Sequence, residues 1–205
     1  MATETASAVR QVRGNPPTGL AAIVVMGVSG AGKTSIGAPL AARLGCAFLE
    51  GDDLHPPANI AKMARGEALD DGDRWPWLHQ LAARIAGWRQ RGECGVLACS
   101  ALKRTYRALL SGGRGDVLFV YLHGSAELLQ QRLARRPGHF MPASLLDSQL
   151  RTLEVPAAGE CLIAVDAAQP PETILQHILR HLADWQQQQG CAPAPGADHA
   201  AGARP

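Results

Sequence analysis

The fold of this chain is decided by the stretch Gly27-Val28-Ser29-Gly30-Ala31-Gly32-Lys33-Thr34. It fits the pattern G-x-x-x-x-G-K-[ST], in which glycines let the backbone turn its N–H groups inward around a phosphate. The continuous apolar run over residues 20–26 predicts a buried parallel strand before it. The pattern over residues 33–44 predicts a helix after it. Strand, loop and helix in this order predict a nucleotide-binding P-loop.

The loop residues have distinct expected roles. Lys33 reaches the β and γ phosphates, and the hydroxyl of Thr34 is a ligand for Mg²⁺. The N-terminus of the following helix adds partial positive charge, and Ser35 lies in its first turn. We therefore expect residues 27–35 to bind ATP, with Lys33 as a catalytic residue and Thr34 as the metal ligand.

Strand and helix patterns alternate outward from this loop. Short apolar strands are expected at residues 46–49, 95–99, 117–122 and 162–165, and helices at 74–91, 103–110, 125–136, 144–153 and 171–187. Pro39 should kink or shorten the first helix. Repeated strand–helix units predict a three-layer α/β fold, with a central parallel sheet and ligands at the carboxyl ends of its strands.

Length and composition favour one soluble domain. We expect a disordered lead-in at residues 1–19, a kinase domain at 20–186 and a flexible tail at 187–205. The net charge is +2, with no basic run suited to nucleic acid, no apolar stretch of membrane-spanning length and no signal-peptide pattern. The five cysteines lack metal-ligand spacing. Free thiols in a reducing compartment are expected, and a cytoplasmic location with them.

An acidic segment, Glu50-Gly51-Asp52-Asp53-Leu54-His55-Pro56, follows the second expected strand. Its place at a strand end beside the P-loop predicts that Asp52 orients an attacking hydroxyl and accepts its proton. A second carboxylate would hold a water of the Mg²⁺ shell. The alternative is a solvated turn with a helix cap, where Asp and Pro are common.

The next motif is Leu69-Asp70-Asp71-Gly72-Asp73-Arg74-Trp75-Pro76-Trp77. Its acids predict a helix N-cap, with Pro76 in the first turn. Arg74 offers a planar fork for a carboxylate. Together with His55 and Lys62 it predicts a cationic pocket for a small acid, near Trp77.

Ser100 and Lys103 follow the third expected strand. An aspartate commonly ends this strand in P-loop proteins, so Mg²⁺ should depend on Thr34, water and an acid such as Asp52. Lys103 should point into the same crevice. The alternative is the start of a surface helix.

Three arginines, Arg132, Arg135 and Arg136, gather at the end of the helix expected at residues 125–136. Arg132 is expected to bind the nucleotide and Arg136 to stabilise the transferred phosphoryl group, as part of a lid that closes over ATP. The alternative is a basic helix C-terminus favoured by the helix dipole.

Taken together, these motifs resemble thermoresistant-type gluconokinases over residues 20–185. The resemblance is carried by Met26–Thr34, by Gly51-Asp52-x-Leu54-His55-Pro56-x-x-Asn59-Ile60-x-Lys62-Met63, by Leu69-x-Asp71-x-Asp73-Arg74-x-Pro76-Trp77-Leu78, by Cys99-Ser100-Ala101-Leu102-Lys103 and by Gly138-His139-Phe140. Members often have aspartate where this chain has Glu50.

The resemblance implies transfer of the ATP γ-phosphate to the 6-hydroxyl of D-gluconate. It also implies Mg²⁺, a homodimer, and a nucleoside-monophosphate-kinase-like fold with about five strands and a lid. The substrate-binding residues expected under it are Asp52, His55, Lys62, Arg74, Trp77, Ser100, Lys103 and His139.

Two other functions are compatible with a P-loop. Another small-acid kinase, such as a shikimate kinase, shares the loop and an acid-binding arginine, but its acceptor motifs are not recognised here. A nucleotide-binding switch or a nucleic-acid ATPase module needs an effector surface or a basic track, and the sequence predicts neither.

Overall fold

Five parallel strands form a central sheet in the order β2-β3-β1-β4-β5 in the computed structural model, which describes residues 17–135, 143–157 and 159–187. The strands are β1 (Ala22–Met26), β2 (Ala47–Glu50), β3 (Gly95–Ala98), β4 (Val117–His123) and β5 (Leu162–Asp166). Ala22 of β1 is in register with Gly95 of β3 and Val117 of β4. Because β1 is central and buried throughout, its sequence is apolar without alternation. The predicted parallel sheet is confirmed.

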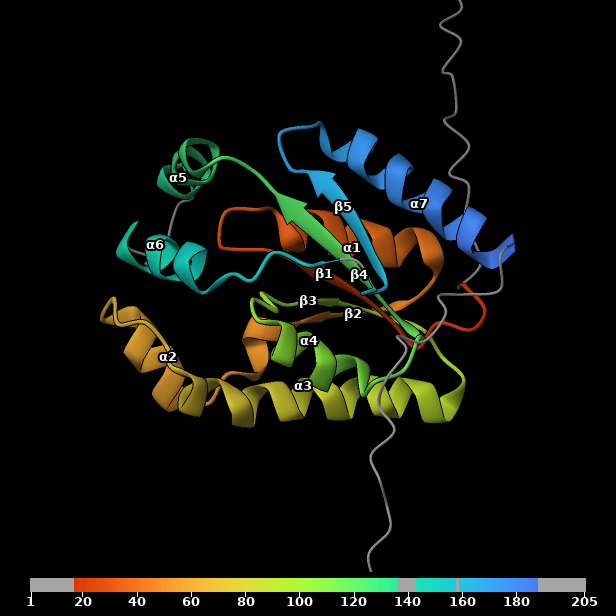
Figure 1. Ribbon diagram of the computed structural model, residues 1–205, viewed down its shortest axis with the longest axis horizontal. Coiled ribbons are helices and arrows are strands. Elements are labelled where there is room, and N and C mark those ends of the chain that lie inside the picture. Colours follow the sequence, from red (N-terminus) through yellow and green to blue (C-terminus); the bar gives the residue numbers. More distant parts are fainter. Residues whose placement is uncertain (1–16, 136–142, 158, 188–205) are drawn as a thin grey trace, which may run out of the picture.

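Helices cover both faces of the sheet (Figure 1). One face carries α1 (Lys33–Leu44) and α7 (Pro171–Gln187), and the other carries α3 (Asp71–Arg91) and α4 (Arg104–Ser111). Successive side chains of β1 alternate between the layers: Ile23 and Val25 belong to the core with α1 and α7, while Val24 and Met26 belong to the core with α3 and α4. The three-layer prediction is confirmed.

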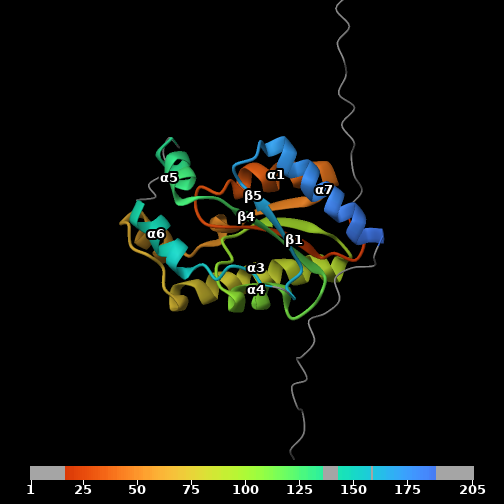
Figure 2. The same ribbon diagram turned by 45° about the horizontal axis from the view of Figure 1, so that its top comes forward.

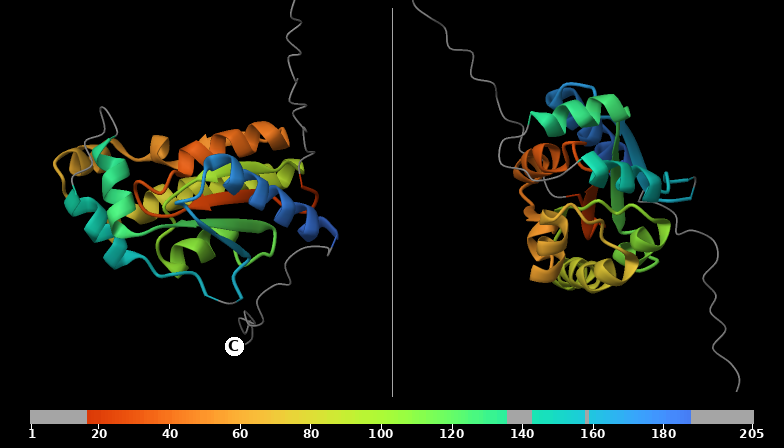
Figure 3. Two further views of the ribbon diagram at one scale, coloured as in Figure 1. Left: turned by 90° about the horizontal axis from the view of Figure 1, so that it is seen from above. Right: turned by 90° about the vertical axis from the view of Figure 1, so that its left-hand side faces the viewer.

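The remaining elements gather at the end of the sheet where the strands finish (Figures 1 and 2). They are the 3₁₀ turn η1 (Gly51–Leu54), α2 (Pro57–Ala64), α5 (Ala126–Ala134) and α6 (Ala143–Thr152). Figure 3 views this end directly in its right-hand panel, with α2 and α6 among the elements that face the reader. Carboxyl ends of parallel strands are where such folds bind ligands. The fold therefore surrounds that edge with short helices.

The structure corrects the expected position of Pro76 and the expected shortening of the first helix by Pro39. Helix α1 runs unbroken to Leu44 although Pro39 lies inside it. Pro39 is exposed, and so is Ser35, whose carbonyl loses its usual partner and faces water on that side. In α3, Pro76 is not in the first turn but in the second, because the helix begins earlier, at Asp71.

The start of α3 confirms the predicted acidic N-cap. The N–H of Asp73 donates to Asp70 Oδ1 at 2.9 Å, and the N–H of Asp70 donates to Asp73 Oδ2 at 2.9 Å. This reciprocal pair is a capping box, and it satisfies two backbone donors that a helix start leaves free. It fixes where α3 begins, and hence where Arg74 lies.

Several further expectations concern the cysteines and the chain ends. Cys46, Cys94 and Cys99 are free thiols as expected, whereas Cys161 is disulfide-bonded and departs from that expectation. Within the part of the chain that the structure describes, no helix is both long and apolar enough to cross a membrane. Residues 1–16 and 188–205, most of the two predicted tails, lie outside the described residues.

Candidate active site

The P-loop connects β1 to α1, and its backbone conformation requires glycine at two positions. Gly27 has a φ of 141°, and a Cβ there would lie 2.6 Å from the carbonyl oxygen of Leu122. Gly30 has a φ of 83°, and its Cβ would lie 2.8 Å from the carbonyl oxygen of Leu129. Both distances are shorter than a real Cβ contact, so neither position accepts a side chain. The loop is thus packed against β4 and α5 in the shape that the motif predicts.

Two polar contacts order the start of α1. Lys33 Nζ donates to the carbonyl oxygen of Val28 at 3.2 Å, so the lysine folds back over its own loop. Thr34 Oγ1 donates to Glu50 Oε2 at 2.6 Å, joining α1 to the end of β2. Burial raises the pKa of the Glu50 carboxyl despite that hydrogen bond. The ammonium, hydroxyl and carboxylate therefore lie together at the mouth of the loop.

A nucleotide-sized cavity of ≈ 570 Å³ lies on one side of the P-loop. Besides residues 29–36 it is lined by Arg132, Leu133, Arg135, Ala167, Gln169, Pro171 and Ile174. Arg132 Nη2 donates to the carbonyl oxygen of Ala167 at 2.7 Å, which holds the guanidinium at the cavity edge. The volume of this cavity lies within the range of small-molecule binding pockets. The predicted nucleotide-binding residues Ser29 to Ser35 and Arg132 all line it.

A second cavity lies on the other side of the P-loop, next to the acidic segment. It is lined by Ser29, Lys33, Asp52, His55, Met63, Ala68, Leu69, Arg74, Trp77, Ser100, Leu145, Ser148 and Gln149. Five predicted acceptor residues are among them: Asp52, His55, Arg74, Trp77 and Ser100. Ser29 and Lys33 line both cavities, so the two meet at the P-loop. We call this second space the acceptor cavity.

A buried aromatic stack supports one wall of the acceptor cavity. The rings of His55 and Trp77 are parallel to within 18°, with centroids 4.1 Å apart. Trp77 Nε1 donates to the carbonyl oxygen of Gly51 at 2.7 Å, which ties α3 to η1. Burial, together with the nearby charge of Arg74, lowers the pKa of His55, although Asp52 opposes this. This lowered pKa favours the neutral imidazole, so His55 contributes a polar group to the predicted pocket.

Arg74 is the buried cation of the acceptor cavity. It is only 7% exposed, and its Nε donates to the carbonyl oxygen of Leu69 at 3.3 Å. Its guanidinium carbon lies 6.0 Å from the centroid of the Tyr106 ring. Among the described residues it forms no salt bridge. A buried guanidinium without an acidic partner is ready to bind an anion.

The structure places two predicted acceptor residues, Lys62 and Lys103, outside this cavity. Lys62 Nζ contacts Asp73 at 2.5 Å and Asp70 at 3.3 Å, and these contacts raise its pKa. Lys103 Nζ contacts Asp71 at 2.7 Å. Both ammonium groups thus bind carboxylates in the first turn of α3 instead of facing the cavity. Of His55, Lys62 and Arg74, which were predicted to form a polar, cationic pocket, His55 and Arg74 line the cavity, and Lys33 of the P-loop lines it as well.

Asp52 and Asp53 are neighbours with different surroundings. Asp52 lines the acceptor cavity, and its Oδ1 lies 3.8 Å from His55 Nε2. Asp53 is exposed and lines neither cavity. The turn η1 therefore directs only the first of the two carboxylates toward the P-loop.

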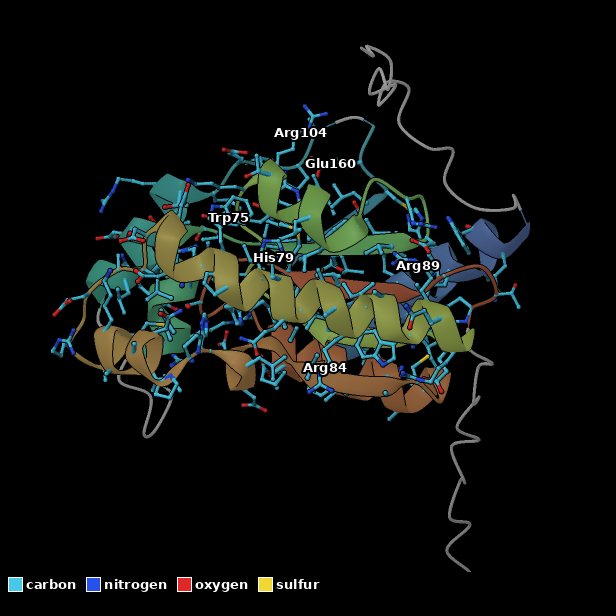
Figure 4. All side chains as sticks on the ribbon, turned by 90° about the horizontal axis from the view of Figure 1, so that it is seen from below. Trp75, His79, Arg84, Arg89, Arg104 and Glu160 are labelled. Carbon is cyan, nitrogen blue, oxygen red and sulfur yellow. The ribbon has the colours of Figure 1, made fainter. Side chains whose placement is uncertain are left out.

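Two residues with long-range contacts were not predicted from the sequence: one lines the acceptor cavity and the other lies outside both cavities. Gln149 of α6 accepts a hydrogen bond from the N–H of Ser29 at 2.7 Å and lines the acceptor cavity. Arg107 of α4 is buried and paired with Glu160, which lies beside α4 in Figure 4. No local pattern marks either residue, because the partners of each lie in other elements of the fold.

Arg136 and His139 lie outside the described residues, as does the segment 137–140. Of the lid arginines, Arg132 and Arg135 are described, at the end of α5.

Comparisons with known proteins cover most of the chain. The AAA domain family matches residues 23–156. Gluconokinase from Gluconobacter oxydans (strain 621H) is 50% identical over 159 residues, which are 78% of this chain and 89% of that protein. Thermoresistant gluconokinase from Escherichia coli (strain K12) is 42% identical over 153 residues, 74% of this chain and 87% of that protein.

Solved structures agree with the sequence relatives. The crystal structure of a gluconokinase from Sinorhizobium meliloti 1021 is 46% identical and has a TM-score of 0.75, covering 88% of this chain and 97% of that one. A shikimate kinase from Acinetobacter baumannii is only 20% identical, with a TM-score of 0.53 over 80% of this chain and 94% of that one. That likeness is one of fold alone.

Proposed function

Since the chain belongs to the gluconokinase family, we propose how its residues divide the work of phosphorylating gluconate with ATP. The reaction transfers the γ-phosphoryl group of ATP to the 6-hydroxyl of D-gluconate, and 6-phospho-D-gluconate and ADP leave. One observation carries the proposal: Ser29 and Lys33 line the nucleotide cavity and the acceptor cavity alike. A group bound to the P-loop therefore borders both spaces.

The P-loop and Lys33 hold the phosphates of ATP. The backbone N–H groups form the anion site, and the Lys33 ammonium neutralises charge as the phosphoryl group moves. Arg132 borders the rest of the nucleotide, and Arg136, at the predicted lid, stabilises the transferred group. Phosphoryl transfer has a loose transition state, so positioning and charge dominate the catalysis.

Mg²⁺ fits the oxygen donors beside the loop. Thr34 Oγ1 and a Glu50 carboxylate oxygen lie 2.6 Å apart, and Mg²⁺ prefers such ligands together with water and phosphate. The described residues contain no group of three or more His, Cys, Asp or Glu able to hold a metal, so an all-protein cage is not expected there. When bound, Mg²⁺ neutralises charge on the phosphate oxygens.

Gluconate lies in the acceptor cavity with its carboxylate on Arg74. A buried guanidinium binds a carboxylate through two parallel hydrogen bonds. At the other end Asp52 orients the 6-hydroxyl, and it takes the hydroxyl proton as the oxygen–phosphorus bond forms and the bond to ADP breaks. Ser100, Trp77 and neutral His55 complete the wall.

Lys62 and Lys103 act through α3. By binding Asp70, Asp73 and Asp71 they fix the first turn of the helix that carries Arg74 and Trp77. His139 belongs to the substrate site through the family resemblance.

The proposal extends to the location, assembly and partners of the enzyme. We propose a cytoplasmic homodimer that binds a small-molecule acid, without nucleic acid or membrane partners. The kinase domain spans residues 20–186, with tails on either side. The modest net charge of +2 supports the absence of a nucleic-acid partner.

An acceptor panel tests the activity. We expect gluconate to stimulate ADP release at least about tenfold over acceptor-free hydrolysis, because a bound, oriented hydroxyl outcompetes water. Shikimate is the comparison acceptor, and phosphorus NMR identifies the product. Equal rates with shikimate, or no stimulation by gluconate, would contradict the proposal.

A pair of variants tests the role of Asp52. Asp52→Asn keeps the shape but removes the base, so kcat should fall on the order of 10²- to 10⁴-fold while ATP affinity is retained. Asp53→Asn is the matched control and should stay near wild type, since Asp53 lines neither cavity. Loss of ATP·Mg²⁺ binding in Asp52→Asn would instead make Asp52 a metal-shell residue, with Glu50 as the next candidate base.

A further inference from the structure

Gln149 joins the P-loop to the acceptor cavity. It lies on α6, is half-buried, and its Oε1 accepts a hydrogen bond from the N–H of Ser29 at 2.7 Å. It also lines the acceptor cavity, as do Leu145 and Ser148 of the same helix. None of the sequence motifs includes this residue.

The contact with Ser29 fixes which end of the carboxamide faces the cavity. A backbone N–H can only donate, so the atom that receives it must be the carbonyl oxygen of Gln149. The NH₂ group then occupies the other branch of the side chain. Nε2 makes no hydrogen bond to any residue that the structure describes. It is therefore an oriented donor at the cavity wall, without a hydrogen-bond partner in the part of the chain that the structure describes.

We propose that Gln149 is a substrate-binding residue that selects a polyhydroxy acid, by donating from Nε2 to a hydroxyl of gluconate. This inference rests on the proposed function, since it assigns a ligand to the same cavity. Arg74 recognises the carboxylate and Asp52 the reacting hydroxyl, but neither distinguishes gluconate from an acid that lacks the hydroxyls between. A donor held by the P-loop supplies that distinction, because a substrate without the matching hydroxyl leaves the donor unpaired.

The acceptor cavity lies between α6, which carries Gln149, and α2, and of these two helices α2 is the less tightly packed. The acceptor cavity has a volume of ≈ 40 Å³, well below the roughly 300 Å³ of small ligand pockets, so part of its wall must be displaced. On the α6 side, Leu145 and Leu146 are buried. On the α2 side, Asn59 is the buried residue of the helix. Since lightly packed segments open most readily, the proposal takes α2 as the helix that yields, with the contact between Gln149 and Ser29 retained.

Monodeoxygluconates combined with Gln149→Met test the proposal. In the wild type, removing the hydroxyl that Gln149 contacts should lower kcat/KM about tenfold, the order of one lost hydrogen bond. In Gln149→Met the same deoxy substrate should react as well as gluconate does, while the other deoxy substrates keep their penalties. Loss of the Ser29 contact acts on gluconate and its deoxy forms alike, so it cancels in the comparison between these substrates. Calorimetry in the presence of a non-hydrolysable ATP analogue measures gluconate binding directly. The dissociation constant for gluconate should be about tenfold higher in Gln149→Met than in the wild type.

Matched variants keep the result unambiguous. Gln80→Met, on the exposed side of α3, controls for the substitution itself. If Gln149→Met does not fold, Gln149→Leu carries the comparison, because it removes the donor and adds no acceptor for a substrate hydroxyl. Deoxy penalties that are all retained in the variant would overturn the proposal. Absence of gluconate turnover in the wild type would instead overturn the proposed function.

Discussion

Replacing Arg107 by methionine should destabilise the protein more than any substitution of an exposed charge. The Arg107 side chain is 2% exposed, and it contacts Glu160 through Nε at 2.5 Å and Nη2 at 3.0 Å. Its Nη1 donates to the carbonyl oxygens of Ala101, Leu102 and Glu154 at 3.1, 3.2 and 3.1 Å. The guanidinium thus joins α4, the loop after β3 and the loop before β5.

The expected magnitude follows from what the substitution leaves behind. Glu160, whose side chain is 13% exposed, would keep a buried charge with no cationic side chain bound to it, and the N–H of Ala157 would be its remaining hydrogen-bond donor among the described residues. Breaking a buried pair from one side costs about 3–5 kcal/mol. At about 2–4 °C per kcal/mol for a domain of this size, Tm should fall by roughly 6–20 °C. Urea unfolding and calorimetry measure the two quantities.

Two controls separate the buried pair from charge in general. Arg91→Met breaks an exposed pair with Glu93, both side chains being more than half exposed, and should cost under about 1 kcal/mol. The double variant Arg107→Met/Glu160→Met removes both charges, so it should be more stable than Arg107→Met alone. An Arg107→Met protein no less stable than Arg91→Met would refute the reasoning.

The same variant should affect catalysis below its Tm. Ala101 has a φ of 43° and is the one non-glycine residue with positive φ among those described. This conformation costs roughly 1–2 kcal/mol, and Arg107 helps to hold it beside Ser100 of the acceptor cavity. We therefore expect a raised KM for gluconate in Arg107→Met, with the KM for ATP unchanged.

Three further predictions concern the site itself. Lys33→Arg should lower kcat by a factor on the order of 10² or more, because a planar fork fits the closed loop badly; near-normal turnover in a steady-state assay would contradict this. Arg74→Lys should raise the KM for gluconate and leave that for ATP unchanged, since lysine lacks the two-pronged contact; a change confined to ATP would place Arg74 on the nucleotide. His55→Phe tests the pKa of His55, which is lowered in the folded state, so the unfolded chain takes up the proton first. As pH falls below about 6.5, the free energy of unfolding of the wild type should fall relative to that of His55→Phe by at most about 1.4 kcal/mol per pH unit. Urea unfolding of both proteins at several pH values measures this difference. A difference that does not change with pH would count against a buried neutral imidazole.

Local sequence was enough to predict the sheet and the P-loop. The β1 run is apolar because both faces of a central parallel strand are buried, and the glycines at positions 27 and 30 are required by backbone geometry. Helix α2 was not predicted, since Asn59 is its only buried residue and an exposed helix has no clear apolar stripe. The acid-rich start of α3 was predicted, because a capping box needs only residues close in sequence.

The contacts between polar residues that are distant in sequence were determined only by the tertiary structure. The sequence placed Lys62 and Lys103 among the acceptor residues by their motifs, but a lysine binds whichever carboxylate the fold brings near, and here that is the start of α3. The Gln149 contact with Ser29 spans 120 positions, and the Arg107 contact with Glu160 spans 53. The chain by itself therefore determined the anion-binding loop and the layers around it, which arise from local backbone geometry and hydrophobic periodicity. Which polar side chains face the acceptor cavity was settled only when packing brought distant segments together.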